Sequence, residues 1–287
     1  MPGITEAQLK AGLSAIKDSR RSQKRTPQRE ILAKRFRHGI DGRRKALGQL
    51  ATIAQPYTPT FIALNTPFLI WANRFLPNSN EPLGTDILVD SHIEPLNNWA
   101  KILLNYATDD AFAATDRLNF YFFWRNETGG DAVVNVASYL TLNGSCKVHA
   151  KSSFWHGLAA PNFSKVSVDA ELSVFEWWNE PPTEPLSEPG QLQNVTPSLE
   201  ADGGEFSDDG KSTLVSANCQ LTYDIFRIPS NDVAVFEVGL SLDYKIAEGN
   251  LTADFSNDDN LVLCPYLQLE VLTVPTNVAA SSGLLSD

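Results

Sequence analysis

The chain has 287 residues, of which 43% are hydrophobic and 20% are charged, a balance typical of a folded globular protein and not of a disordered or fibrous one. The most apolar stretch, residues 60–72, is interrupted by Asn65 and Pro67, and no run reaches the roughly 18 apolar residues of a membrane helix. Residues 1–17 lack the charged-then-apolar order of a secretory signal. We therefore expect a protein without a membrane span or signal peptide, either cytoplasmic or part of an assembled particle.

The charge is divided unevenly along the chain, whose formal net charge is −11. Residues 1–50 hold 13 Lys and Arg against 4 Asp and Glu, a net of +9, which leaves 10 basic and 30 acidic residues, a net of −20, for residues 51–287. A basic segment tethered to an acidic body can dock on that body, on a neighbouring copy, or on a polyanion such as nucleic acid. The sequence leaves these alternatives open.

The first elements expected along the chain are helices. Leu9, Leu13 and Ile16 recur at helical spacing after Thr5, a suitable N-cap, and predict a helix over residues 6–18.

Two further helices are expected before the chain changes character. Thr26 and Pro27 combine an N-cap with a proline at the first helical position, which predicts a second helix ending near residue 38. Asp41 caps a third helix that Pro56 ends. The last two helices have helix-turn-helix spacing, and DNA binding is one interpretation of their basic face. No side chain there is singled out as a reader of bases.

The basic residues of this arm are candidates for docking on a subunit or a polyanion. Residues 17–45 are the part through which nucleic acid would bind. The candidate residues are Arg20, Arg21, Lys24, Arg25, Arg29, Lys34, Arg35, Arg37, Arg43, Arg44 and Lys45.

From Pro56 onward the hydrophobic period changes to two, which indicates antiparallel strands with one hydrated face. Residues 166–174 and 215–225 alternate in this way, and residues 118–124 are continuously apolar, as in a strand buried on both faces. Further strands are expected near residues 58–64, 68–72, 86–90, 191–196 and 261–274, and a short helix over 97–106.

Three local features of the strands are also predicted. Asn143 and Gly144 are typical of a hairpin turn, and the loop 229–232 is expected to connect a second hairpin. The apolar alternation within residues 232–247 changes phase near Glu237, which predicts a β-bulge there.

The pattern predicts a mainly β fold: an antiparallel, jelly-roll-like β-sandwich over residues 56–287, preceded by a basic helical N-terminal arm over residues 1–55. This layout of a basic arm joined to a β-sandwich resembles that of jelly-roll viral coat proteins. The resemblance implies a coat- or shell-like subunit that assembles with copies of itself.

Three tryptophans, Trp155, Trp177 and Trp178, are candidates for a ligand platform for carbohydrate or a protein partner. The last two precede an acidic, proline-rich stretch that is expected to be stiff and extended. The same tryptophans can instead pack beneath a structural corner. In a third interpretation Glu176 and Glu180 form the carboxylate pair of a glycosidase.

Other chemistry has little support in the sequence. Cys146, Cys219 and Cys264 each lie in an apolar run and are expected to be buried free thiols. The acidic stretches 202–209 and 254–260 do not have the spacing of known calcium loops, and His149 and His156 lack carboxylate partners at metal-ligand spacing. No nucleophile elbow or phosphate-binding glycine loop occurs. We expect no metal, cofactor or enzymatic activity.

Two functions from different classes remain. The first is a self-assembling, homo-oligomeric structural subunit whose arm docks on neighbouring subunits or on enclosed nucleic acid. The second is a carbohydrate- or protein-binding β-sandwich module that uses the loop tryptophans.

Overall fold

The computed structural model describes residues 59–75, 87–152, 162–177, 186–194, 199–203 and 207–272. These residues form antiparallel sheets, so the protein is mainly β, as predicted. The strands are β1 (Pro59–Asn65), β2 (Leu69–Phe75), β3 (Leu88–His92), β4 (Trp99–Thr108), β5 (Phe112–Arg125), β6 (Ala132–Ala150), β7 (Phe163–Trp177), β8 (Leu186–Asn194), β9 (Leu199–Asp202), β10 (Asp209–Ile228), β11 (Val233–Ala247), β12 (Gly249–Phe255), β13 (Leu261–Leu263) and β14 (Leu267–Leu272).

Sheet A has eight strands and is built around β6, which is 19 residues long. One edge of β6 pairs with β10 along nearly its whole length. The other edge pairs in turn with β14, β13 and β12. β1 extends the sheet from β14, while β4 pairs with both β12 and β13 and carries β3 on its far side.

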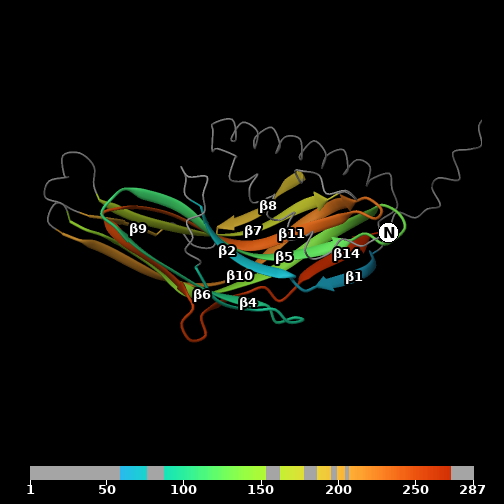
Figure 1. Ribbon diagram of the computed structural model, residues 1–287, viewed down its shortest axis with the longest axis horizontal. Coiled ribbons are helices and arrows are strands. Elements are labelled where there is room, and N and C mark those ends of the chain that lie inside the picture. The colour runs from blue at the N-terminus through green and yellow to red at the C-terminus, as the bar shows by residue number, and fades with distance from the viewer. Residues whose placement is uncertain are drawn as a thin grey trace, which may run out of the picture.

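Sheet B has six strands in the order β2-β5-β11-β7-β8, with β9 beside the start of β7. β11 is its central strand and pairs with β5 and β7 without a register shift. Figure 1 shows the long strands of both sheets running along the long axis of the molecule. At about 3.3 Å per residue, the 20 residues of β10 span about 65 Å.

The two sheets pack against each other around one core. The largest fully buried side chains include Phe122 and Phe236 from sheet B and Phe255 from sheet A. Many consecutive strands lie in opposite sheets, including the pairs β4–β5, β5–β6, β10–β11 and β11–β12. Glu248 alone joins β11 to β12. Crossing connections of this kind are typical of β-sandwiches.

The hairpin predicted at Asn143 and Gly144 is wrong, because β6 runs through both residues without a turn. A Cβ atom on Gly144 would lie 2.5 Å from Cδ1 of Phe255 and 2.6 Å from the carbonyl oxygen of Asp254. Glycine is therefore required here because a neighbouring strand approaches closely, and not because the chain turns.

The second predicted hairpin is also wrong. Residues 229–232 do connect β10 to β11 by a short loop, but the two strands belong to different sheets and do not pair. A short polar loop makes the chain reverse direction. It does not determine which strand the next strand pairs with.

The β-bulge predicted near Glu237 is absent, since β11 keeps its register on both sides. All residues from Val233 to Leu242 are buried, so both faces of this part of the strand are covered. The change of phase in the pattern reflects burial of both faces. A register shift occurs instead in β10, between Tyr223 and Phe226.

The helix predicted over residues 97–106 is replaced by β4, in which Ala100, Ile102 and Leu104 are completely buried at a period of two. Other expectations are confirmed. Residues 166–174 and 215–225 lie in long strands, and residues 118–122 of the predicted 118–124 are buried on both faces, whereas Phe123 is 43% exposed. Cys146, Cys219 and Cys264 are buried free thiols.

The predicted arm, residues 1–55, lies outside the described residues, so its helices and the boundary near residue 56 stay predictions. Within the described ranges no helix is long and apolar enough to cross a membrane.

Candidate functional site

The outer face of sheet B is the candidate site, and the register of β11 defines it. The even-numbered side chains from Ala234 to Ile246 belong to the core between the sheets. The odd-numbered side chains from Val233 to Lys245 therefore point to the opposite face. The register places Tyr121 of β5 and Ser173 of β7 beside Glu237 on this outer face.

One half of this face is apolar. Val233, Val235 and Tyr121 form a second small cluster, against which Phe68, Leu69 and Trp71 pack. Val235 is completely buried, and Tyr121 is 3% exposed. Such low exposure is characteristic of a core and not of the outer side of a sandwich, where one face is normally in contact with water.

The other half is polar and carries several carboxylates. Asp169, Glu171, Glu237 and Asp243 lie here, together with the guanidinium of Arg117. Their neighbours help to hold them: Ser173 donates to Glu171 at 2.9 Å, and Thr115 donates to Asp243.

Gly239 makes room for this arrangement, because a Cβ atom there would lie 2.0 Å from Oδ1 of Asn119. The Asn119 side chain thus lies over β11 and donates to the hydroxyl of Tyr121 at 3.2 Å. The polar and apolar halves of the face are joined by this hydrogen bond.

The polar half is as deeply buried as the apolar half. Glu237 is 3% exposed, Ser173 2% and Asp169 8%. No strand of the described residues lies over this face, since sheet A packs on the opposite side of sheet B. Charged and polar side chains are seldom this buried unless partners are present. The burial marks the outer face of sheet B as a contact surface.

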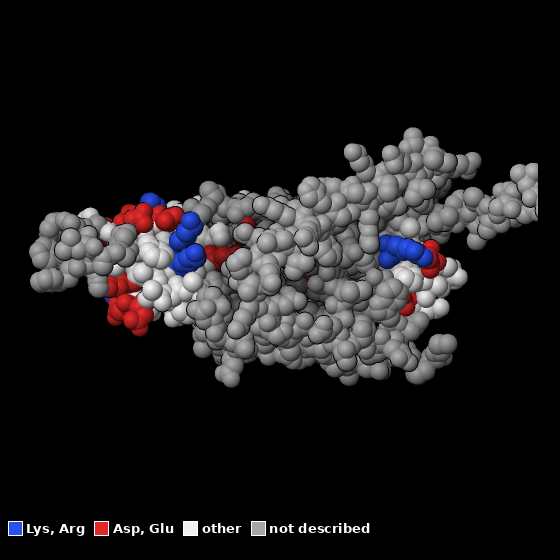
Figure 2. Space-filling model, turned by 90° about the horizontal axis from the view of Figure 1, so that it is seen from above, with Lys and Arg blue, Asp and Glu red and all other residues white. Residues whose placement is uncertain are grey.

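Charged side chains also gather at the two ends of the molecule, as Figure 2 shows among the described residues. At the end where β9 lies, Lys151 is 2.5 Å from Asp109, and this hydrogen bond raises the pKa of the lysine. The Ser152 amide donates to Asp208 at 2.7 Å and lowers the pKa of that carboxyl. These contacts hold together loops from different parts of the chain.

The same cluster contains Nε2 of His149, 3.5 Å from Asp208. A nucleophile activated by a general base would require histidine between serine and aspartate. Here Asp208 stands between Ser152 and His149, and all three are partly or fully exposed. The arrangement ties loops together and does not prepare a nucleophile.

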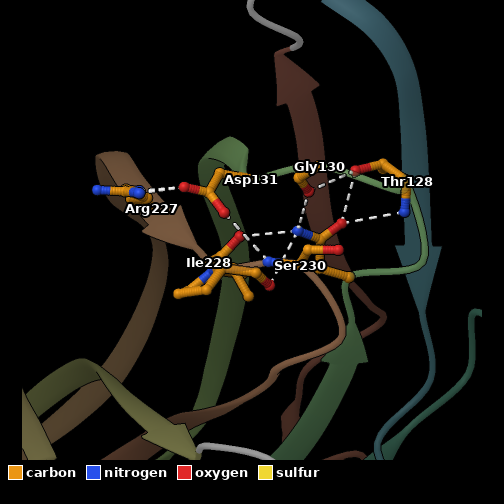
Figure 3. Close-up of polar contacts among 8 residues, drawn as sticks. Thr128, Gly130, Asp131, Arg227, Ile228 and Ser230 are labelled. Carbon is orange, nitrogen blue, oxygen red and sulfur yellow. Dashed lines mark hydrogen bonds and ion pairs between the residues drawn. The ribbon is translucent and has the colours of Figure 1, made fainter.

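At the opposite end, Asn126 joins the β5–β6 and β10–β11 loops. Figure 3 shows Gly130 and Asp131 of the first loop beside Ile228 and Ser230 at the second. The Nδ2 atom of Asn126 lies 2.7 Å from the carbonyl oxygen of Gly130, 2.8 Å from that of Ile228 and 3.0 Å from that of Pro229. Beside it, Arg227 binds Asp131 and lowers the pKa of that carboxyl. This end is also a structural tie.

The site residues predicted from the sequence fall largely outside the described residues. This applies to all eleven basic residues of the arm and to Trp155, Trp178, Glu180 and His156. Trp177 is the last residue of β7 and Glu176 precedes it. The structure therefore leaves both the docking arm and the tryptophan platform as predictions.

The acidic stretch 254–260 folds on itself. Asp254 accepts hydrogen bonds from the amide and the hydroxyl of Ser256, both at 2.9 Å, and from the side chain of Asn257. Across the described part of the chain, no three His, Cys, Asp or Glu side chains are grouped to hold a metal ion.

Sequence reasoning missed the outer face of sheet B. A signal was present, because Val233 and Val235 continue an apolar pattern in the phase opposite to Val238 and Leu240. Two apolar phases in one strand predict that both of its faces are covered.

Comparison with known proteins gives no family. No protein-family model matches the chain, and no curated protein matches it in sequence. Solved structures of infectious bursal disease virus are among the matches in shape. The Gt strain structure is 10% identical with a TM-score of 0.13, covering 77% of this chain and 66% of that chain. The structure of the VP2 subviral particle is 10% identical with a TM-score of 0.13, covering 79% of this chain and 64% of that chain. The chain spans just under two thirds of these neighbours, and at such TM-scores the likeness carries no argument.

Proposed function

We propose that this chain is a self-assembling structural subunit of coat or shell type. Its body is a sandwich with jelly-roll-like connections. Its basic arm, residues 1–55, docks on the outer face of sheet B of a neighbouring copy. The observation that carries the choice of face is the burial, within a single chain, of Asp169, Ser173 and Glu237 on a face that no described strand covers, and the choice of a neighbouring copy rests on exchange of the arm between identical chains.

Charge complementarity supports the arm as the partner of this face. The polar half presents four carboxylates, those of Asp169, Glu171, Glu237 and Asp243, against the basic side chains of Arg117, Lys165 and Lys245, of which Lys165 already pairs with Glu200 at 3.0 Å. Residues 1–50 carry a net charge of +9. Bringing basic side chains to buried carboxylates reduces the cost of removing these carboxylates from water.

The apolar half supports the same occupant. The cluster of Val233, Val235 and Tyr121, against which Phe68, Leu69 and Trp71 pack, makes this half of the face apolar, and the arm offers apolar side chains of its own at Leu9, Leu13 and Ile16. An amphipathic helix with a basic face would satisfy both halves at once.

The arm has sufficient length to act between copies. It is joined to the body at β1, which starts at Pro59, so 58 residues precede the body. A docking site used within one chain is equally available on an identical neighbour, and exchange of the segment then links subunits without a new type of contact.

Light scattering coupled to size-exclusion chromatography tests assembly on the full chain. We expect a mass above the 31.6 kDa of one chain, decreasing when salt is raised from about 50 mM to about 500 mM, because salt screens the arm from the carboxylates. Arg20→Glu with Arg21→Glu should reduce the mass at low salt. Lys101→Glu with Lys147→Glu, which changes the charge equally on sheet A, should not. A single-chain mass at every salt concentration would disprove assembly.

Carbodiimide cross-linking, which joins lysine directly to carboxylate, tests the docking face. We expect links from Lys24, Lys34 or Lys45 to Glu171 or Asp243. In a mixture of ¹⁴N and ¹⁵N chains, links between differently labelled chains show docking on a neighbour, and links only within one label contradict it. Links confined to sheet A would overturn the choice of face. Copurified nucleic acid, detected by absorbance at 260 nm and released by salt, would identify a polyanion as the occupant of the arm instead.

A further inference from the structure

The edge strand β10 has one paired side. Its 20 residues pair with β6 from Asp209 to Ile228, and no described strand pairs with its other side. Such an edge presents a row of main-chain N–H and C=O groups that can accept another strand. Natural proteins usually protect long edges with charges, prolines, bulges or short length.

The central part of β10 has none of these protections. Ser212–Tyr223, twelve residues, contains no charged residue, no proline and no glycine, and its register with β6 has no shift. The other edges differ. β1 starts with Pro59, β2 contains Arg74, β3 has a register shift before Asp90, β8 contains Pro189, and β9 has only four residues.

The side chains of this segment are also suited to contact. On the outer face, Ser216, Asn218 and Gln220 are exposed and small or uncharged. Leu214 lies on the same face with 82% of its surface exposed, the highest value among the large hydrophobic side chains of the described residues. A long, uncharged edge with an exposed leucine is a site of strand addition.

We infer that two copies of this chain pair through β10, antiparallel, about a two-fold axis normal to sheet A. The inference names an interface for the self-assembly proposed above and rests on that function. A second copy suits this edge because an antiparallel register centred on Asn218, which places Ser216 opposite Gln220, brings no like charges together. The pairing joins the two copies of sheet A into one continuous sheet, with both Leu214 side chains on the same face.

Charge substitutions on the full chain test the pairing. Ser216→Lys with Gln220→Lys places four lysines along the shared edge, where they repel. We expect the dissociation constant of the dimer, measured by light scattering over a concentration series, to rise at least about tenfold. The control is Asn105→Lys with Asn250→Lys, which adds the same charge on β4 and β12. Both residues are exposed, Asn250 lies on a strand that is paired on both sides, and neither residue is on β10, so the control should dimerise normally.

A rescue experiment distinguishes loss of strand pairing from misfolding of the Lys variant. The Lys variant mixed with Ser216→Glu and Gln220→Glu should restore a mixed dimer, because opposite charges then face each other across the two-fold axis. Failure of the mixture to dimerise, or a Lys variant that dimerises like the wild type, would overturn the pairing.

The dependence of the assembly on salt distinguishes the β10 interface from arm docking. Main-chain hydrogen bonds persist at about 500 mM salt, whereas contacts between exposed charges weaken. We expect the wild type and the Arg20→Glu, Arg21→Glu variant both to remain dimeric there. If the wild type is monomeric at high salt but larger at low salt, the β10 interface is contradicted and arm docking is not. Hydrogen exchange should show that the amides of Ser212–Tyr223 that point away from β6 become protected as concentration rises, and unchanged exchange would argue against pairing.

Discussion

The side-chain amide of Asn126 lies 2.8 Å from the carbonyl oxygen of Ile228, a residue 102 positions later in the chain, and donates a hydrogen bond to it. Asn126 is completely buried, and its Oδ1 accepts hydrogen bonds from the amide and the hydroxyl of Thr128. One asparagine therefore fixes the crossing from β5 to β6 beside the crossing from β10 to β11. These crossings decide which strands enter which sheet.

Replacing Asn126 with alanine should lower the free energy of unfolding by about 1–3 kcal/mol, because it removes the side-chain donor from the buried carbonyl of Ile228 and from the part-buried carbonyl of Pro229. Urea denaturation measures the change. Glu127→Ala alters the neighbouring, exposed residue and should cost less than about 0.5 kcal/mol. Equal effects of the two substitutions would contradict the role given to Asn126.

Gly144→Ala tests the continuous strand β6. The added methyl group would meet Phe255 and the carbonyl of Asp254, so we expect a loss of about 1–3 kcal/mol in unfolding free energy. Gly130→Ala is the control, since a Cβ atom there has no neighbour within 4 Å. If Gly144 instead occupied an open hairpin turn, Phe255→Leu would not restore any of the unfolding free energy lost in Gly144→Ala. In the structure described here, Phe255→Leu should recover part of it in the double variant.

The Arg227–Asp131 pair should add stability that depends on pH. Hydrogen bonding to Arg227 lowers the pKa of Asp131 from its ordinary 3.8, so the folded state favours the ionised carboxyl. The stabilisation is therefore present above pH 3.8 and is lost as the pH falls through the lowered pKa. The difference in melting temperature between the wild type and Arg227→Gln should be constant near pH 6–7 and disappear in acid. Lys147→Gln, on an exposed lysine of β6, should show no such dependence, and a difference that persists below the lowered pKa would refute the assignment.

The three cysteines should resist modification in the native protein. Burial raises the pKa of Cys146 and of Cys264 to about 12 and also raises that of Cys219, so little thiolate forms near pH 8. A disulfide-exchange reagent should label none of the three within minutes and all three after denaturation in urea. Rapid labelling of one thiol in the native state would show that its strand opens locally.

Local patterns determined a large part of this protein. Alternation in residues 166–174 and 215–225 predicted the long strands, because the side-chain period of a strand is two wherever the strand is placed. The same apolar runs predicted the burial of Cys146, Cys219 and Cys264. The division of charge at residue 50 follows from composition alone and predicts docking of the basic segment on an acidic surface or a polyanion.

Tertiary structure decided what local pattern cannot contain. Gly144 fits a turn and a crowded strand equally well, and only the approach of Phe255 from β12 separates the two. The phase change near Glu237 fits a bulge or a strand with two covered faces, and only the unbroken pairing of β11 with β5 and β7 shows the second. In both cases the deciding contacts join residues more than 50 positions apart, so their energy leaves no trace in the neighbouring sequence.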